Sequence, residues 1–322
     1  MDLSIIIVNW NSEAYLRECL ASVFEYTHGI DYEIIVVDNA SPNKNVDTLS
    51  EEFPSIRVIK SAQNLGFSAA NNLGFRSSSG RVVLFLNPDT LLMDPAITTL
   101  LANLDNLPDA GVVGGRLLNT DLSVQTSCIQ RFPTIANQLL DIEVIRLRWP
   151  ACKLWNIAPL FSSDKNPAQV EVISGACTML KRHVFEQIGM FSEEYFMYAD
   201  DMELCHKAKR AGYTNYYVGD AVLVHHGGGS SKQREVRQWA TVMKFKAMMH
   251  FCSKTRGPGY AFLFRLSMGC AALIRLMAVF ILSTVGSKLV HRKNALSKWT
   301  AVLKWSTGWH VSELTTVGES HS

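Results

Sequence analysis

The chain has 322 residues, 48% of them hydrophobic and 19% charged, which is enough apolar sequence for one large domain with a buried core and a smaller part. Its net charge of +2 hides an asymmetry, because 14 of the 31 Lys and Arg residues but only 3 of the 29 Asp and Glu residues follow residue 230. The seven cysteines are scattered and include no C-x-x-C pair, which argues against a disulfide framework and against a structural zinc site. This cysteine usage fits a reducing cytoplasm, and the apolar run at 5–8 is too short for the core of a signal peptide.

Strands and helices alternate through the first third of the chain. We predict strands at 3–8, 33–37, 56–60 and 81–86, and helices at 13–26, 66–78 and 95–104. The strands are nearly continuous aliphatic runs, typical of a parallel sheet covered on both faces, so the fold class is α/β. Asp38 and Asp89 lie just past strand ends, where such sheets bind ligands, so we expect them to converge on one site.

The second half of the chain is less regular before the pattern returns. Residues 116–169 are predicted as irregular, and regular structure resumes with a strand at 170–180, a helix at 200–211 and a strand at 216–225. We therefore expect a catalytic domain at 1–230 and a C-terminal helical region at 231–322.

Two groups of residues have the chemistry of a metal site. Asp89 ends the sequence Asn-Pro-Asp after a buried strand, and a carboxylate there suits Mg²⁺ or Mn²⁺ that also binds substrate phosphates. The alternative is a simple turn. His225 and His226 end a strand before three glycines, so either histidine is a candidate metal ligand, and the alternative is a flexible linker.

Two further segments are candidates for substrate contacts. Asp200 and Asp201 open a helix, where one acid could cap the helix and the other act as a general base; an ordinary cap with first-turn acids is the alternative. Residues 64–74 turn into a helix N-terminus that suits a pyrophosphate, although their small side chains could equally serve helix–sheet packing.

The joint order of these segments resembles glycosyltransferase family 2. It starts with the apolar run ending in Asn9-Trp10-Asn11 and continues through Asp38-Asn39-Ala40-Ser41, the turn at Asn64, Asn87-Pro88-Asp89, the acidic pair and the histidine. The resemblance covers about residues 3–230 and is nearest to the rhamnosyltransferase-like branch. It implies an inverting enzyme of the GT-A fold, a Rossmann-like, mostly parallel sheet with helices on both faces.

The resemblance also implies roles for individual residues. Asp38 would bind a pyrimidine base, Asp89 and His225 the metal, and Asp201, with Asp200 as the second candidate, would deprotonate the acceptor hydroxyl. The family's metal motif is Asp-x-Asp, with Asp89 as its last acid. Asn87 stands at the position of the first acid, so the chain departs from the motif there. The implied nucleotide-sugar contacts are Asn9, Asp38, Asn64, Gly66, Asn71, Asn87 and Gly175.

The implied reaction moves a sugar from a nucleoside diphosphate to an acceptor hydroxyl with inversion. The donor would be an NDP-sugar of UDP or dTDP, with rhamnose as a candidate sugar and Mg²⁺ or Mn²⁺ as cofactor. The acceptor would be a saccharide or a polyprenyl-linked saccharide in bacterial surface polysaccharide biosynthesis. The oligomeric state stays open.

The sequence bears on three rival functions. A dinucleotide-dependent oxidoreductase should carry G-x-G-x-x-G after the first strand, where the chain has Asn9-Trp10-Asn11-Ser12. A lipase-like hydrolase would need a G-x-S-x-G elbow, which the sequence lacks. A catalytically inactive sugar-nucleotide-binding or scaffold protein stays the alternative, favoured by Asn87 and opposed by the retained acids.

The C-terminal region predicts basic amphipathic helices on an anionic membrane surface. From residue 231 to 310 there are 14 Lys and Arg and one acid, interleaved with aromatic residues, a composition suited to an interfacial helix. The most apolar segment, 260–286, contains Arg265 and Arg275, and its longest uncharged stretch has 12 residues, whereas a span needs about 20.

We therefore expect a peripheral protein on the inner face of the cell membrane. Crossing the bilayer, and packing on the catalytic domain or on a second subunit, are the alternatives. Nucleic acid is not expected as a partner, because no known nucleic-acid motif accompanies the charge.

Overall fold

The protein divides into two compact units. The computed structural model describes residues 1–42, 46–140, 149, 167–227, 234–284 and 292–308. Unit 1 comprises Met1–Phe132 and Ile157–Ser230, and unit 2 comprises Pro133–Asn156 and Ser231–Ser322. The boundary expected at residue 230 lies outside the described residues, and a segment after residue 132, which the sequence prediction gave to the catalytic domain, joins unit 2.

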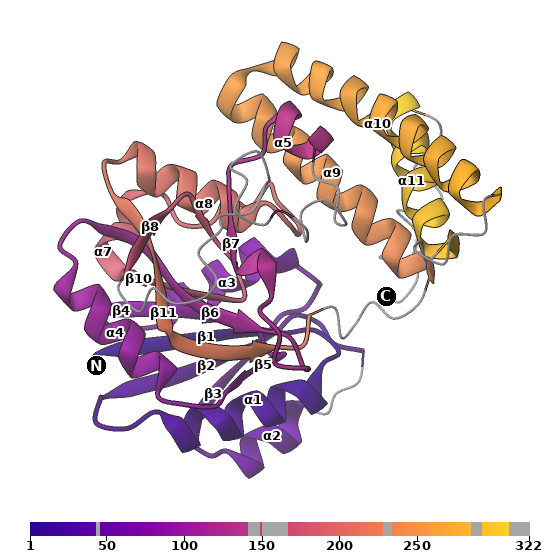
Figure 1. The fold of residues 1–322 in the computed structure, drawn as a ribbon. Coiled ribbons are helices and arrows are strands. Elements are labelled where there is room, and N and C mark those ends of the chain that lie inside the picture. Colours follow the sequence, from indigo (N-terminus) through magenta and orange to yellow (C-terminus); the bar gives the residue numbers. More distant parts are fainter. Residues whose placement is uncertain (43–45, 141–148, 150–166, 228–233, 285–291, 309–322) are drawn as a thin grey trace. The chain divides into compact units, whose positions relative to one another are not determined.

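Unit 1 is built on one mixed sheet. Within the described residues it has nine strands in the order β3-β2-β1-β4-β10-β6-β11-β5, with β8 on β11 (Figure 1). Their bounds are β1 (Leu3–Asn9), β2 (Tyr32–Asp38), β3 (Ile56–Lys60), β4 (Val82–Leu86), β5 (Thr90–Leu92), β6 (Ala110–Leu118), β8 (Ala168–Val170), β10 (Cys177–Lys181) and β11 (Thr214–His225). Strands β1 to β4 are parallel, whereas β10 is antiparallel to both β4 and β6. The expected α/β class with a largely parallel sheet is confirmed.

Six α-helices of unit 1 are described, and four of them lie where helices were predicted. The six are α1 (Glu13–Tyr26), α2 (Val46–Glu52), α3 (Gly66–Arg76), α4 (Ala96–Asn106), α7 (Arg182–Gln187) and α8 (Asp200–Arg210). The four that were predicted are α1, α3, α4 and α8. Helix α3 packs on β1 and β2, with Ala70 and Leu73 against Ile35 and Val37. Its small side chains therefore do serve helix–sheet packing, one of the two roles that the sequence left open.

The strand expected at 170–180 is wrong as a single element. Strand β9 (Val172–Ile173) pairs with β7 (Ile129–Gln130) in a separate two-stranded sheet, and the chain then turns before it enters the main sheet as β10. The turn is held because Asn87 N donates to Ala176 O and Ser174 N donates to Cys128 O. Backbone pairing, which hydropathy does not reveal, divides this apolar run.

Unit 2 is helical. Its described elements are α5 (Ile135–Leu140), α9 (Arg234–Arg256), α10 (Pro258–Thr284) and α11 (Arg292–Thr307). Phe245, Met248, Phe264, Met268 and Trp305 are among the buried side chains that hold α9, α10 and α11 together. Among the described residues one helix is long and apolar enough to cross a membrane, at Pro258–Ile281, and a third of its apolar window is buried.

Candidate functional site

The carboxyl ends of β1 and β2 place two polar side chains together. Asn9 and Asp38 are paired in the parallel register, and Asn9 Nδ2 donates to Asp38 Oδ1 at 3.1 Å. Asn9 also donates to Ser41 Oγ and accepts from the Ser12 backbone N–H, so its amide ties the loops after both strands. Asp38 is only 6% exposed, and its carboxylate is fixed at the end of the sheet, where ligands of α/β folds bind.

Asn39 joins this pair to the loop before α3. Its Nδ2 donates to Asn64 Oδ1 at 2.9 Å and to Gly66 O, and its Oδ1 accepts from Leu65 N at 2.8 Å. Three predicted nucleotide contacts, Asp38, Asn64 and Gly66, are therefore held in one hydrogen-bonded group. Asn39, which directly follows Asp38, had no role predicted from the sequence.

Gly66 packs against the backbone that leads to the acidic pair. It has φ +77°, and a Cβ added to it would lie 2.5 Å from Phe196 O. Phe67 N donates to the same oxygen at 2.8 Å. Only glycine fits there without a shift, and the contact fixes the segment before α8 against the start of α3.

Asn71 differs from the other predicted nucleotide contacts. It is 1% exposed, and its Nδ2 donates to Phe67 O within α3. The structure thus gives its amide a partner inside the helix rather than among Asp38, Asn39 and Asn64.

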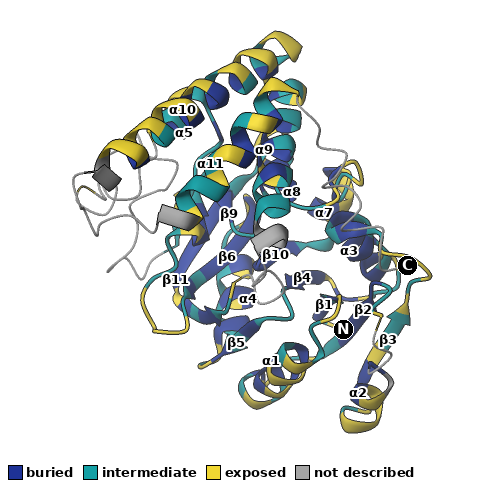
Figure 2. Cartoon of the chain, turned by 90° about the vertical axis from the view of Figure 1, so that its right-hand side faces the viewer, coloured by how far each residue is buried: buried dark blue, intermediate teal, exposed yellow. Residues whose placement is uncertain are grey.

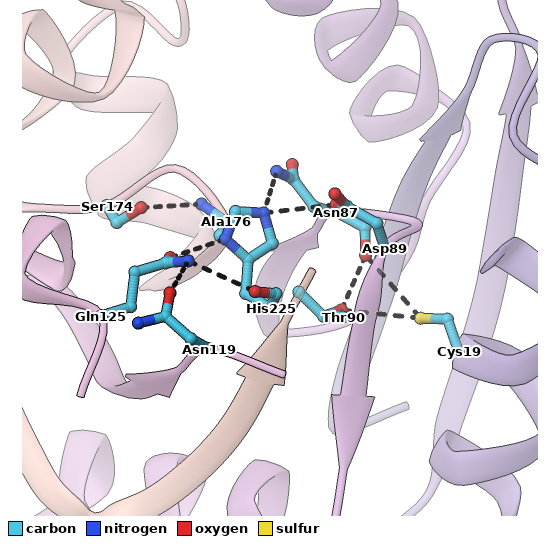
Figure 3. A network of polar contacts seen from close by, with 9 residues as sticks. All are labelled: Cys19, Asn87, Asp89, Thr90, Asn119, Gln125, Ser174, Ala176 and His225. Carbon is cyan, nitrogen blue, oxygen red and sulfur yellow. Dashed lines mark hydrogen bonds and ion pairs between the residues drawn. The ribbon is translucent and has the colours of Figure 1, made fainter. Parts of the chain in front are cut away.

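Asp89 and His225 are brought together by the pairing of β5 with β11. In that register His225 lies opposite Thr90, and His226 N donates to Asp89 O at 3.0 Å. The His225 Nε2 atom lies 3.3 Å from Asp89 Oδ1 and 3.4 Å from Asn87 Nδ2, with the ring between Asn87 and Gln125 (Figure 3). The sequence left His225 and His226 as alternatives, and the strand register turns His225 toward Asp89.

His226 faces a different neighbour. Its ring lies 5.0 Å from the Tyr15 ring of α1, and its Nε2 is buried without a hydrogen-bond partner. The ring of His226 therefore packs against α1, and its Nε2 atom takes no part in the hydrogen bonds around Asp89.

The electrostatics at Asp89 favour a carboxylate. Burial would raise the pKa of Asp89, but the hydrogen bond and charge of His225 outweigh it, and the net shift is downward. The described residues contain no group of three or more His, Cys, Asp or Glu side chains placed to hold a metal ion. A carboxylate and an imidazole nevertheless fit a divalent cation that takes its other ligands from a diphosphate and water.

The acidic pair follows two residues in the left-handed region of φ. Tyr198 has φ 69° and Ala199 has φ 58°, and α8 begins directly after them. Non-glycine residues rarely adopt such angles, and they cluster at functional sites. The kink directs Asp201 toward the 174–176 loop, where Asp201 Oδ2 accepts from Gly175 N at 3.1 Å.

Asp200 and Asp201 have different surroundings. Burial, and secondly the charge of Asp201, raise the pKa of Asp200 to about 8, so Asp200 holds a proton at neutral pH. Asp200 is 6% exposed, whereas Asp201 is partly exposed. Because Asp200 is uncharged, it does not repel a negative charge on Asp201, which can therefore be ionised.

The 174–176 loop connects the acidic pair with the Asn87 turn. Gly175 N contacts Asp201, and Ala176 O accepts from Asn87 N at 2.9 Å. A Cβ on Gly175 would lie 3.5 Å from Asp201 Cβ, so the loop backbone packs closely against the acidic pair. The structure therefore links the predicted metal, base and sugar contacts through a single loop.

Comparison with known proteins shows the family of the chain. The profile described as "Glycosyl transferase family 2" matches residues 4–189, and "Glycosyl transferase family group 2" matches 151–282. An N-acetylglucosaminyl-diphospho-decaprenol L-rhamnosyltransferase of Mycobacterium tuberculosis is 28% identical over 243 residues, covering 71% of this chain and 77% of its own. The low-salt glycan biosynthesis hexosyltransferase Agl10 of Haloferax volcanii is 31% identical, covering 69% of this chain and 66% of its own.

Solved structures show the same fold. The mannosyltransferase PcManGT of Pyrobaculum calidifontis, in complex with GDP-Man and Mn²⁺, aligns with a TM-score of 0.55 at 18% identity, over 95% of this chain and 86% of its own. Residues 1–349 of Staphylococcus aureus TarS align with a TM-score of 0.51 at 15% identity, over 97% of this chain and 93% of that chain. The predicted GT-A architecture is confirmed.

Proposed function

Because the chain belongs to glycosyltransferase family 2, in its rhamnosyltransferase-like branch, we propose that it transfers rhamnose or a related sugar from UDP or dTDP to a lipid-linked saccharide, with inversion. One observation carries this proposal most strongly. Asp89 and His225, the acidic pair at Asp200 and the hydrogen-bonded group around Asp38 lie on segments tied together at the carboxyl edge of one sheet.

The donor nucleotide is assigned to the group at Asp38. Its carboxylate can accept hydrogen bonds from the N–H of uracil or thymine, and these bases present the same edge to it. Asn9 and Asn39 hold the surrounding loops, which supports a preformed base site. Rhamnose is proposed because the Mycobacterium tuberculosis relative is an L-rhamnosyltransferase.

A divalent cation is assigned to Asp89 and His225. When bound, Mg²⁺ or Mn²⁺ supplies positive charge to the departing diphosphate. Asp89 is held as a carboxylate, and His225 Nε2 faces it at 3.3 Å, so both donors are in place. Asn87 offers an amide in place of an acid, and its side chain reaches the same imidazole.

Asp201 is assigned as the base that takes the proton of the acceptor hydroxyl. A base has to be ionised, and the raised pKa of Asp200 supports Asp201 rather than its neighbour. Gly175 N donates to Asp201 and orients the carboxylate in the loop that also contacts the Asn87 turn. Attack from the side opposite the diphosphate gives inversion.

The exposed side of helix α10 supports the proposal that the protein binds to the membrane in which a lipid-linked acceptor is anchored. One side of it exposes large apolar residues that are between 48% and 61% exposed (Figure 2). They are Phe262, Leu263, Leu266, Leu273, Ile274 and Met277. A contiguous apolar stripe in a basic region fits a helix lying in an anionic lipid surface, which we assign to the inner face of the cell membrane.

The function is tested by incubating the full chain with a panel of NDP-sugars, Mn²⁺ and a polyprenyl diphosphate-linked N-acetylglucosamine. We expect transfer from one pyrimidine donor, with the anomeric configuration of the product inverted when read by NMR. Thermal shifts with UDP, dTDP, GDP and CDP identify the nucleotide, since a ligand at 100 times its Kd adds about 2.7 kcal/mol.

Two results would contradict parts of the proposal. Binding of a nucleotide without transfer from any donor to any acceptor would favour the inactive sugar-nucleotide-binding alternative. If Asp89→Ala binds the nucleotide with unchanged Mn²⁺ dependence, the assignment of the cation is wrong.

A further inference from the structure

Gln125 contacts the side of His225 that faces away from Asp89. His225 Nδ1 and Gln125 Oε1 are 2.7 Å apart, the shortest contact that the imidazole makes among the described residues (Figure 3). Gln125 Nε2 points the other way and donates to Asn119 Oδ1 at 3.2 Å and to His225 O at 3.3 Å. Rotating the amide by 180° would place an oxygen against two acceptors, so the contacts fix which atom of Gln125 faces the ring.

The carboxylate of Asp121, four residues before Gln125, determines which groups donate and which accept in the hydrogen bonds from Ser123 to Gln125. Asp121 can only accept when ionised, and the hydrogen bonds of Ser123 lower the pKa of Asp121. Ser123 gives its hydroxyl proton to Asp121, so its oxygen accepts from Asn119 Nδ2 at 2.9 Å. Asn119 must then present Oδ1 to Gln125 Nε2, which leaves Gln125 Oε1 for the histidine.

This chain of hydrogen bonds determines which nitrogen of the His225 imidazole carries a proton. Gln125 Oε1 cannot donate, so Nδ1 of His225 must carry a proton. When the ring is neutral, its one proton therefore resides on Nδ1, and the Nε2 lone pair faces Asn87 Nδ2, which can donate to it. The hydrogen bond from Nε2 to Asp89 belongs to the ring that carries both protons, and in the neutral ring Nε2 is the atom open to a cation beside the Asp89 carboxylate.

We propose that Gln125 is a positioning residue that holds His225 as the Nδ1–H tautomer, so that Nε2 is free to bind the divalent cation of the nucleotide site. The inference rests on the proposed function, because it assigns the cation to Asp89 and His225. A histidine that binds a metal commonly donates its other ring N–H to an oxygen, and here the oxygen comes from a loop 100 residues earlier in the chain.

The tautomer is read directly from ¹⁵N chemical shifts of the histidine rings at a pH where the imidazole is neutral, with His225 assigned by its loss in His225→Gln. We expect a protonated Nδ1 and an unprotonated Nε2 in the wild type. In Gln125→Leu the acceptor is gone, and the ring should move toward the Nε2–H tautomer, because Asp89 accepts from that side. Gln125→Glu keeps an acceptor and should keep the wild-type tautomer.

Metal affinity gives the second measurement, from titration of Mn²⁺ into protein saturated with UDP or dTDP. Loss of a group that orients a metal ligand typically weakens metal binding about 10- to 100-fold, which we expect for Gln125→Leu. Gln125→Glu should bind no more weakly than the wild type. Gln130→Leu is the matched control, because Gln130 lies five residues away and donates to Ser127 O outside this network.

The outcomes separate the two proposals. An unchanged His225 tautomer, or unchanged Mn²⁺ affinity, in a folded Gln125→Leu variant overturns the role of Gln125. If Gln125→Leu does not fold, Gln125→Met, which keeps the length of the side chain but has no amide oxygen, should also move the ring toward the Nε2–H tautomer, and a pure Nδ1–H ring there would overturn it. If wild-type nucleotide binding ignores Mn²⁺, the assignment of the cation fails, while the ¹⁵N shifts still decide whether Gln125 sets the tautomer.

Discussion

Asp200 and Asp201 are adjacent in sequence but are expected to differ in charge at neutral pH. Asp200 is buried at the start of α8, whereas Asp201 is partly exposed and accepts from Gly175 N. Close carboxylates rarely ionise together, and burial decides which one keeps the proton. The sequence named both acids, but their different surroundings follow from the kink at Tyr198 and Ala199, which composition does not reveal.

We predict that Asp201→Asn keeps nucleotide affinity and loses transfer. The base acts only as the acceptor hydroxyl attacks, so kcat and kcat/KM should fall together, by roughly 10²- to 10⁴-fold. Steady-state rates with the donor found in the panel, together with nucleotide titrations, measure both quantities. Asp200→Asn is the control and should retain most of the activity; an inactive Asp200→Asn with an active Asp201→Asn would reverse the assignment.

The pH dependence of stability should report Asp200. Its folded pKa of about 8 lies above its unfolded value, so the folded state holds a proton that the unfolded state has lost between about pH 4 and pH 8. The stabilisation from this proton is complete below pH 4 and is lost as the pH rises through 8. Asp200→Asn removes the effect, so its unfolding free energy relative to the wild type should rise across this window. A constant difference between pH 4 and 8 in urea unfolding would contradict the raised pKa.

At the scale of elements, the sequence predicted those whose pattern is local. The strands β1 to β4 and the helices α1, α3, α4 and α8 match the expected segments closely. The central strand β6 was not predicted, because Gly111, Gly114 and Gly115 lower its strand propensity. Those glycines are required by tertiary neighbours, since a Cβ on Gly114 would meet Ile173 and one on Gly115 would meet Ala221 O.

The choice between His225 and His226 also depended on long-range pairing. Both are strand-end histidines in the sequence, and the alignment of β11 with β5 decides which one reaches Asp89. The same holds for Gln125, which lies in a segment predicted as irregular and contacts His225 only through the fold. From the sequence, Gln125 is an amide residue in a polar loop. Such residues are too common for this one to be predicted as a functional residue.

The contact between the start of α3 and Phe196 can be tested with a pair of glycines. Gly66 and Gly29 have nearly the same φ, +77° and +76°, but a Cβ on Gly29 would meet nothing within 4 Å. Gly29→Ala should therefore cost only the left-handed backbone penalty, roughly 1–2 kcal/mol. Gly66→Ala should cost about 1–3 kcal/mol more, because Phe196 O has to move.

Urea unfolding of the two variants measures this difference. Equal losses for Gly29→Ala and Gly66→Ala would mean that the Phe196 contact adds nothing. A larger loss for Gly66→Ala, with weaker nucleotide binding, would connect the loop at Asn64 with the segment before the acidic pair.

At the scale of the whole molecule, unit 2 differs from unit 1 in both charge and surface. Arg265 and Arg275, which in the sequence argued against insertion of this segment in a bilayer, do not interrupt the apolar side of α10. Arg265 donates to Ser306 O and Trp305 O, and Arg275 donates to Gln138 O and Leu139 O. Their charges are directed to backbone carbonyls of unit 2, so the exposed side of α10 keeps an uncharged apolar stripe.

Replacement of this stripe should weaken binding to lipid. The test is the double variant Leu266→Gln with Met277→Gln, which changes residues of α10 that are 48% and 58% exposed. The control is the double variant Leu122→Gln with Met93→Gln, which changes the same residue types in unit 1 at 57% and 55% exposure. Burial of each side chain in lipid is worth about 1.5–3 kcal/mol, so even partial insertion predicts at least a roughly tenfold loss for the α10 variant and none for its control. Flotation of the full chain with anionic vesicles measures both.

Salt and neutral vesicles separate the two contributions to this binding. Basic residues near an anionic surface are screened by salt, whereas burial of apolar side chains is not, so high salt should weaken wild-type binding without abolishing it. The α10 variant should then lose most of the salt-resistant part, and the unit 1 control should behave as the wild type. Equal flotation of both variants would exclude α10 as the lipid contact. If the α10 variant instead changes the sedimentation of the protein in the absence of lipid, the stripe is a contact between copies of this chain, because a surface that meets only lipid leaves the mass in solution unchanged.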